Sequence, residues 1–82
     1  MKMLELWEKT KEILEGELSK NTFEKWISPL EFHSASKGDE LILIAPSTLN
    51  KREIKKYISF IDNTIFYNFD LYKLITVRFQ EE

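Results

Sequence analysis

The sequence predicts a small α+β domain in which three helices pack on a three-stranded sheet. Three observations carry this prediction. The chain has 82 residues, which gives room for a single core. Its apolar fraction of 43% is sufficient to fill that core. Helical and strand patterns alternate in the order ααββαβ, for which a two-layer sandwich is the stable arrangement. We therefore treat residues 1–82 as one domain.

The first two predicted helices occupy the N-terminal third of the chain. Residues 4–18 place apolar side chains at helical spacings and form a broad apolar face. A shorter helix follows, in which either Asn21 or Thr22 is the N-cap. This helix ends before Pro29, because the residue that precedes a proline is displaced from the α region.

The middle of the chain predicts a β-hairpin. One strand covers residues 31–36 and its partner covers residues 40–45, with the turn supplied by Lys37-Gly38-Asp39. The single histidine, His33, lies in the first strand without a cysteine or an evident carboxylate partner. We therefore interpret it as a surface or edge residue and not as a metal ligand or a catalytic base.

The returning strand of this hairpin is apolar on both faces. If its other side chains face the helices, then Ile42 and Ile44 lie on the open face of the sheet. These two isoleucines either pack under the C-terminal tail, near Phe69 or Tyr72, or form an apolar contact surface.

A third helix and a last strand complete the predicted fold. The helix covers residues 47–67, with Ser47 and Asn50 as competing N-caps and a break or kink expected at Asp62-Asn63. Residues 73–79 alternate as a strand does. A crossover through this helix allows the last two strands to pair in parallel, in a mixed sheet.

Composition limits the classes of function. The chain carries 12 basic and 14 acidic residues and no cysteine, which excludes a disulfide framework and suits a reducing compartment. No apolar run approaches the roughly 18 residues of a membrane span, so we expect a cytoplasmic protein without a membrane partner. A net charge of −2 argues against dedicated nucleic-acid recognition. One basic cluster leaves weak contact with single-stranded nucleic acid as an alternative: Lys51, Arg52, Lys55 and Lys56.

Motifs for common catalytic chemistry are absent from the sequence. A phosphate-binding loop cannot form, because the only glycines are Gly16 and Gly38. No nucleophile elbow, HExxH motif or calcium loop occurs either. We therefore expect no catalytic residues, no metal site and no cofactor in these residues.

Three segments resemble, in order, the N-terminal domain of the bacterial replication initiator DnaA. They are Leu6-Trp7, Thr22-Phe23-Glu24-Lys25-Trp26-Ile27, and Leu41-Ile42-Leu43-Ile44-Ala45-Pro46. The resemblance covers nearly the whole chain and implies the same ααββαβ order, which is described for that family as similar to KH domains. The Gly-x-x-Gly loop of RNA-binding KH domains is missing, so similarity of fold does not imply RNA binding.

The resemblance implies a non-catalytic interaction domain that acts in the initiation of DNA replication. Its implied partners are other copies of the initiator, the replicative helicase during loading at the origin, and regulators that differ between bacterial lineages. ATP is expected only in the ATPase domain further along such initiators. The implied location is the bacterial cytoplasm, in association with the nucleoid. A stand-alone KH-like module that binds single-stranded nucleic acid weakly is the alternative.

The resemblance also assigns residues. It implies self-association through Leu6 and Trp7, with a purely structural core position as the other interpretation of Trp7. Trp26 is alternatively a core residue. Thr22 stands at a position where the family often has Glu, and its other interpretation is a helix cap. Helicase and regulator contacts are implied for six residues: Asn21, Thr22, Lys25, Trp26, Ser47 and Leu49. Glu53 stands where the family commonly has Trp, which leaves the register around Leu49 open.

Overall fold

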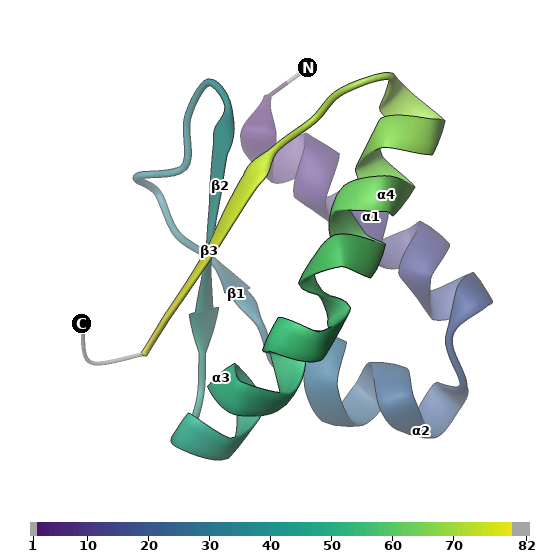
Figure 1. The fold of residues 1–82 in the computed structure, drawn as a ribbon, viewed down its shortest axis with the longest axis vertical. Coiled ribbons are helices and arrows are strands. Elements are labelled where there is room, and N and C mark those ends of the chain that lie inside the picture. The colour runs from purple at the N-terminus through teal and green to yellow at the C-terminus, as the bar shows by residue number, and fades with distance from the viewer. Residues whose placement is uncertain (1, 80–82) are drawn as a thin grey trace.

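The computed structural model describes residues 2–79, which form a two-layer α+β sandwich. In this part of the chain the helices lie on one side of a three-stranded sheet (Figure 1). The strand order is β1-β2-β3, with β1 antiparallel and β3 parallel to the central strand. The predicted fold class and the mixed sheet are therefore confirmed.

Helix α1 spans Met3–Glu17 and confirms the first predicted helix. It presents a buried face to the core through Leu6, Trp7, Thr10 and Leu14. The one polar member is satisfied within the helix, because the Thr10 hydroxyl donates a 2.7 Å hydrogen bond to the carbonyl oxygen of Leu6. This bond lets a threonine occupy a core position without an unpaired polar group.

The second helix begins earlier than predicted. It consists of α2 (Lys20–Thr22) and a π-helical turn, η1 (Phe23–Ile27). The N-cap is Ser19, whose Oγ accepts a 3.1 Å hydrogen bond from the backbone N–H of Thr22. The predictions of Asn21 or Thr22 as the cap are therefore wrong, because both residues already lie inside the helix.

The hairpin has a shorter first strand than predicted. Strand β1 covers only Glu31–Phe32, whereas β2 covers Glu40–Ala45 as expected. Beyond β1 the backbone turns, because His33 Nδ1 accepts from the N–H of Ala35 at 2.9 Å and its carbonyl accepts from the N–H of Ser36 at 3.0 Å. The histidine thus holds a local turn within the half-buried edge of the sheet.

Beyond β1, a side chain forms hydrogen bonds with the backbone of β2 in place of a strand partner. The Ser36 hydroxyl accepts from the N–H of Ile42 at 2.7 Å and donates to its carbonyl at 3.1 Å. Ile42 is 2% exposed, which ends its interpretation as a contact surface. Of the two side chains expected to cover it, Phe69 packs against the main core and Tyr72 stacks on Phe66 of α4.

The third predicted helix is divided into three segments. Helix α3 (Thr48–Ile54) passes through a 3₁₀ turn, η2 (Lys55–Tyr57), into α4 (Ile58–Phe69). The predicted break at Asp62-Asn63 is wrong. The Asp62 carboxylate instead accepts a 3.0 Å hydrogen bond from the backbone N–H of Lys73, outside the helix.

Strand β3 (Leu74–Phe79) closes the fold beside β2. Pairs such as Leu41 with Ile75 and Leu43 with Val77 place apolar side chains side by side under the helices. The main core joins both layers; its fully buried members from the crossover helices are Ile54, Ile61 and Ile65. None of the helices in residues 2–79 has the length and apolarity needed to cross a bilayer.

The cap at Ser19 yields a test with a matched control. Replacement of Ser19 by Ala removes the acceptor for the Thr22 N–H and should lower the free energy of unfolding by about 0.5–2 kcal/mol. Asn21→Ala, at an exposed helical position, should change it by less than about 0.5 kcal/mol. Urea denaturation measures the free energy of unfolding of both variants. A larger loss of stability in Asn21→Ala than in Ser19→Ala would indicate that Asn21 is the N-cap.

Candidate protein-interaction surface

The pair Leu6 and Trp7 does not form a surface. Each side chain is 2% exposed and belongs to the main core, so Trp7 occupies the core position given above as its other interpretation. Trp7 faces inward because its stripe on α1 is the one that packs towards η1 and α4. Self-association of the domain stays a prediction. Because Leu6 and Trp7 are buried, other side chains would have to make the contact.

Asn50 joins the two segments that carry the remaining predicted residues. Its side chain is 3% exposed, and its Nδ2 donates a 3.3 Å hydrogen bond to the carbonyl oxygen of Trp26 at the end of η1. Ser47 frees Asn50 for this contact, since Ser47 itself caps α3 by accepting from the Asn50 N–H at 3.0 Å. The competing prediction of Asn50 as the cap is wrong, and its bridging role was not foreseen.

The contact between η1 and α3 sets apolar and basic groups next to each other. Leu49, in the first turn of α3, is 54% exposed. Trp26 is half-buried against the core, and the Lys25 Nζ lies 5.0 Å from the centre of its ring, within cation–π range. We call Lys25, Trp26, Ser47 and Leu49 the η1–α3 surface.

The other two residues predicted for this surface precede it on α2. Asn21 is exposed. Thr22 is half-buried, and its hydroxyl oxygen accepts a 2.8 Å hydrogen bond from Ser19 Oγ. This bond places the Thr22 hydroxyl in the polar network that starts the helix, although Thr22 is not the N-cap.

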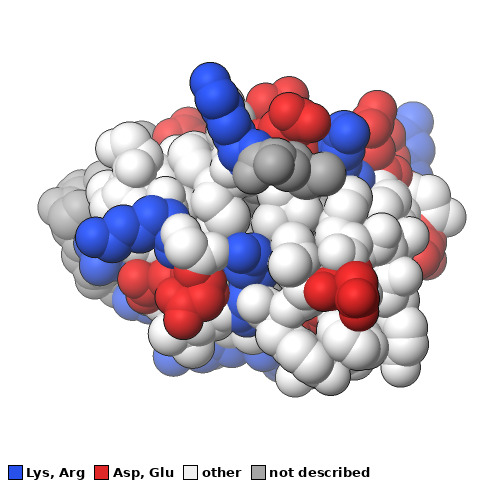
Figure 2. Space-filling view, turned by 90° about the horizontal axis from the view of Figure 1, so that it is seen from above, with Lys and Arg blue, Asp and Glu red and all other residues white. Residues whose placement is uncertain are grey.

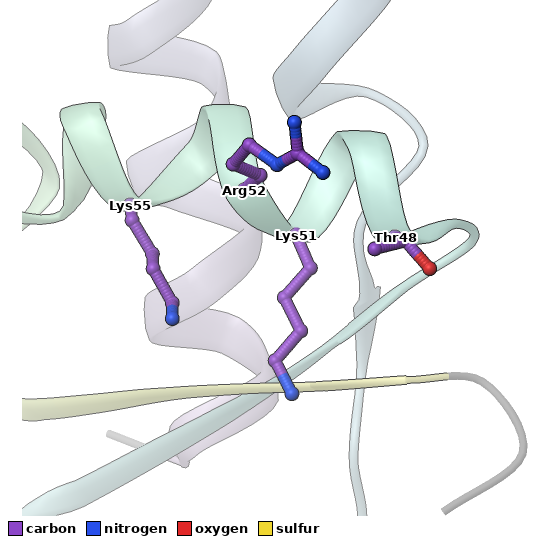
Figure 3. Close-up of a pocket in the computed structure, with 4 residues that line it drawn as sticks. All are labelled: Thr48, Lys51, Arg52 and Lys55. Carbon is purple, nitrogen blue, oxygen red and sulfur yellow. The ribbon is translucent and has the colours of Figure 1, made fainter.

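Next along α3, basic side chains line an open hollow of about 290 Å³. Thr48, Lys51, Arg52 and Lys55 form its walls, and Figure 3 shows Lys51 and Lys55 extending to the same side of the helix. Lys56 lies apart from this group, because its Nζ pairs with the Glu53 carboxylate at 3.0 Å. The structure thus brings together three of the four residues of the predicted basic cluster.

This arrangement suits binding more than chemistry. Leu49 is exposed on α3, and Trp26 is partly buried on the adjoining η1 with the Lys25 ammonium near its ring; apolar and aromatic side chains of this kind are frequent in protein-binding patches. A model of the DnaA N-terminal domain family matches residues 4–67. The chain belongs to the DnaA N-terminal domain family. It is therefore a domain of a replication initiator, and the match runs from the first turn of α1 into the last turn of α4.

The buried position of Trp7 in this DnaA N-terminal domain gives a second test. Trp7→Ala should lower the free energy of unfolding by about 3–5 kcal/mol, since it removes a large core side chain. Leu49→Ala, at a 54% exposed position, should change it by less than about 0.5 kcal/mol. Thermal and urea denaturation measure the stability of both variants. A Trp7→Ala variant of unchanged stability would contradict the core position of Trp7.

Proposed function

We propose that this chain is a non-catalytic docking domain of the initiator, which recruits the replicative helicase and initiation regulators through the η1–α3 surface and also self-associates. The observation that carries the proposal is the exposed Leu49, in the first turn of a helix that the buried Asn50 ties to the Trp26 carbonyl of η1. A rigid apolar anchor loses little conformational freedom on binding, which favours it as a contact point. No cofactor is required for this role.

The small size of the η1–α3 surface suits weak binding by a single copy. A stable interface buries about 800 Å² on each partner, more than one leucine and one half-buried tryptophan provide. Assembly of many initiators at an origin would raise the effective concentration of the patch and convert weak contacts into tight ones. Helicase recruitment would then depend on prior assembly of the initiator.

An NMR amide-shift titration of the labelled domain with the replicative helicase of the same organism tests this proposal. We expect shifts around Lys25, Ser47 and Leu49, and a dissociation constant raised about tenfold or more in Leu49→Ala. Leu4→Ala, an exposed leucine at the start of α1 and outside this surface, is the matched control. The absence of shifts at high helicase concentration would remove helicase recruitment from the proposal.

The basic hollow on α3 supports a second candidate function, weak binding of single-stranded nucleic acid. Cations that line one hollow, spaced along α3 and η2, are suited to phosphate groups. The net charge of −2 predicts that such binding is weak and disappears as salt rises.

Fluorescence anisotropy with labelled single-stranded DNA over a salt series measures this second function. The double variant Arg52→Ala and Lys55→Ala should reduce the salt slope by about 1 for each phosphate group that the variant no longer binds. Lys56→Ala is the control, because that ammonium already pairs with Glu53. Equal slopes in the double variant and the parent chain would rule out the hollow as the site.

A further inference from the structure

Exposed apolar side chains are concentrated at the end of α4 and in the link that follows it. Four of the large hydrophobic residues that are exposed among residues 2–79 lie within one short stretch; they are Tyr67 (81%), Leu71 (40%), Tyr72 (67%) and Leu74 (65%). None of them was predicted as a site residue, and three of them lie beyond the matched family region. This stretch is therefore a second exposed apolar region, separate from the η1–α3 surface.

Three aromatic rings form a continuous cluster there. The rings of Phe66 and Tyr72 stack with their centroids 4.3 Å apart and an interplanar angle of 17°. Tyr67 meets Phe66 edge to face, with centroids 5.4 Å apart. Together with Leu71, which projects from the link between helix and strand, these residues are called here the aromatic patch: Phe66, Tyr67, Leu71 and Tyr72.

Backbone contacts hold the aromatic patch in place. Asp70 adopts the left-handed conformation (φ 56°) that ends α4, and its N–H donates a 2.8 Å hydrogen bond to the Phe66 carbonyl. The next residues are anchored by the bond from Lys73 N–H to Asp62 and by a 2.7 Å bond from Leu74 N–H to the Asp39 carbonyl. The backbone that carries the rings is thus held by hydrogen bonds within the domain, which lowers the entropic cost of docking.

The aromatic patch and the η1–α3 surface lie at opposite ends of the molecule. Figure 1 shows α4 ending at the top and α3 beginning at the bottom. Seen from above, charged side chains of both signs are interspersed with uncharged areas (Figure 2). A partner bound at one end would therefore leave the other end accessible.

We propose that the aromatic patch is the surface through which a second copy of this chain docks. An isologous dimer brings the same patch of both copies together, so the patch must complement itself. The four side chains of the aromatic patch carry no charge and so meet this condition, whereas a surface made of charged side chains of one sign would repel its own copy. Single-stranded nucleic acid is a poorer fit, because base-stacking platforms are accompanied by a basic groove and Asp70 lies within this stretch.

The exposed area fits a weak dimer. An aromatic side chain presents roughly 150–250 Å², so the exposed fractions of Tyr67 and Tyr72, 81% and 67%, leave roughly 220–370 Å² of ring surface on each copy. That area is the centre of an interface and falls short of the roughly 800 Å² per partner of a stable one. The inference rests on the self-association in the proposed function, and it gives that function a contact surface in place of the buried Trp7.

Self-association of the 82-residue chain tests the surface directly. Sedimentation and amide shifts are followed over a concentration series that reaches about 1 mM, a range suited to weak dimers. We expect concentration-dependent shifts at residues 66–73 and a dimer dissociation constant raised about tenfold or more in Tyr67→Ser. Leu49→Ser, which changes an exposed apolar residue at the other end of the molecule, should leave the dissociation constant unchanged.

Tyr67→Ser is the main variant because the Tyr67 ring touches Phe66 only at an edge, so its loss should disturb the fold little. Tyr72→Ser is the second variant, and circular dichroism checks that it is folded. If the parent chain dimerises and both variants dimerise equally well, the aromatic patch is wrong and self-association stands. If the parent chain stays monomeric over the whole concentration series, the proposal of self-association is wrong. If Leu49→Ser alone weakens the dimer, the second copy docks at the η1–α3 surface instead.

Discussion

The parallel pairing of β2 with β3 is the constraint on which the rest of the structure depends. Parallel strands require a crossover, and here that crossover is the whole of α3, η2 and α4. Because the crossover returns across the sheet, Ile54, Ile61 and Ile65 reach the core and close it against α1. The same path places the start of α3 against η1, where Asn50 meets the Trp26 carbonyl. Both proposed surfaces are therefore set by one strand pairing.

Hydrophobic periodicity was sufficient to predict the order of elements and the fold class, because it reflects which faces must leave water. The prediction failed where a side chain replaced a backbone partner. Ser36 bonds both polar groups of Ile42 and ends the first strand early, while Ser19 starts the second helix before Asn21. The Asp62 carboxylate behaved likewise, since it bonds Lys73 across the fold and leaves α4 unbroken. Such bonds depend on tertiary neighbours that a local sequence pattern does not contain.

The candidate site was predictable in part. The exposure of Leu49 was implied by the family resemblance and not by the local pattern. The burial of Trp7 could not be separated from exposure by helical spacing alone, because both stripes of α1 carried apolar residues. Asn50 resembled a cap in sequence and became a bridge between segments. The aromatic patch had a visible signal, with Phe66, Tyr67 and Tyr72 close together in sequence. The left-handed turn at Asp70 that stacks them was not predicted.

The position of β3 at the edge of the sheet has a consequence for how copies of the domain meet. An edge strand offers unpaired backbone groups that can template intermolecular sheet extension and, in time, fibrils. Here β3 is bracketed by cations, with Lys73 directly before it and Arg78 near its end, and the Lys73 ammonium donates to the Gly38 carbonyl beside it. Charged edges of this kind disfavour backbone zippering. The proposed association would thereby be left to side chains of α4 and of the link that follows it.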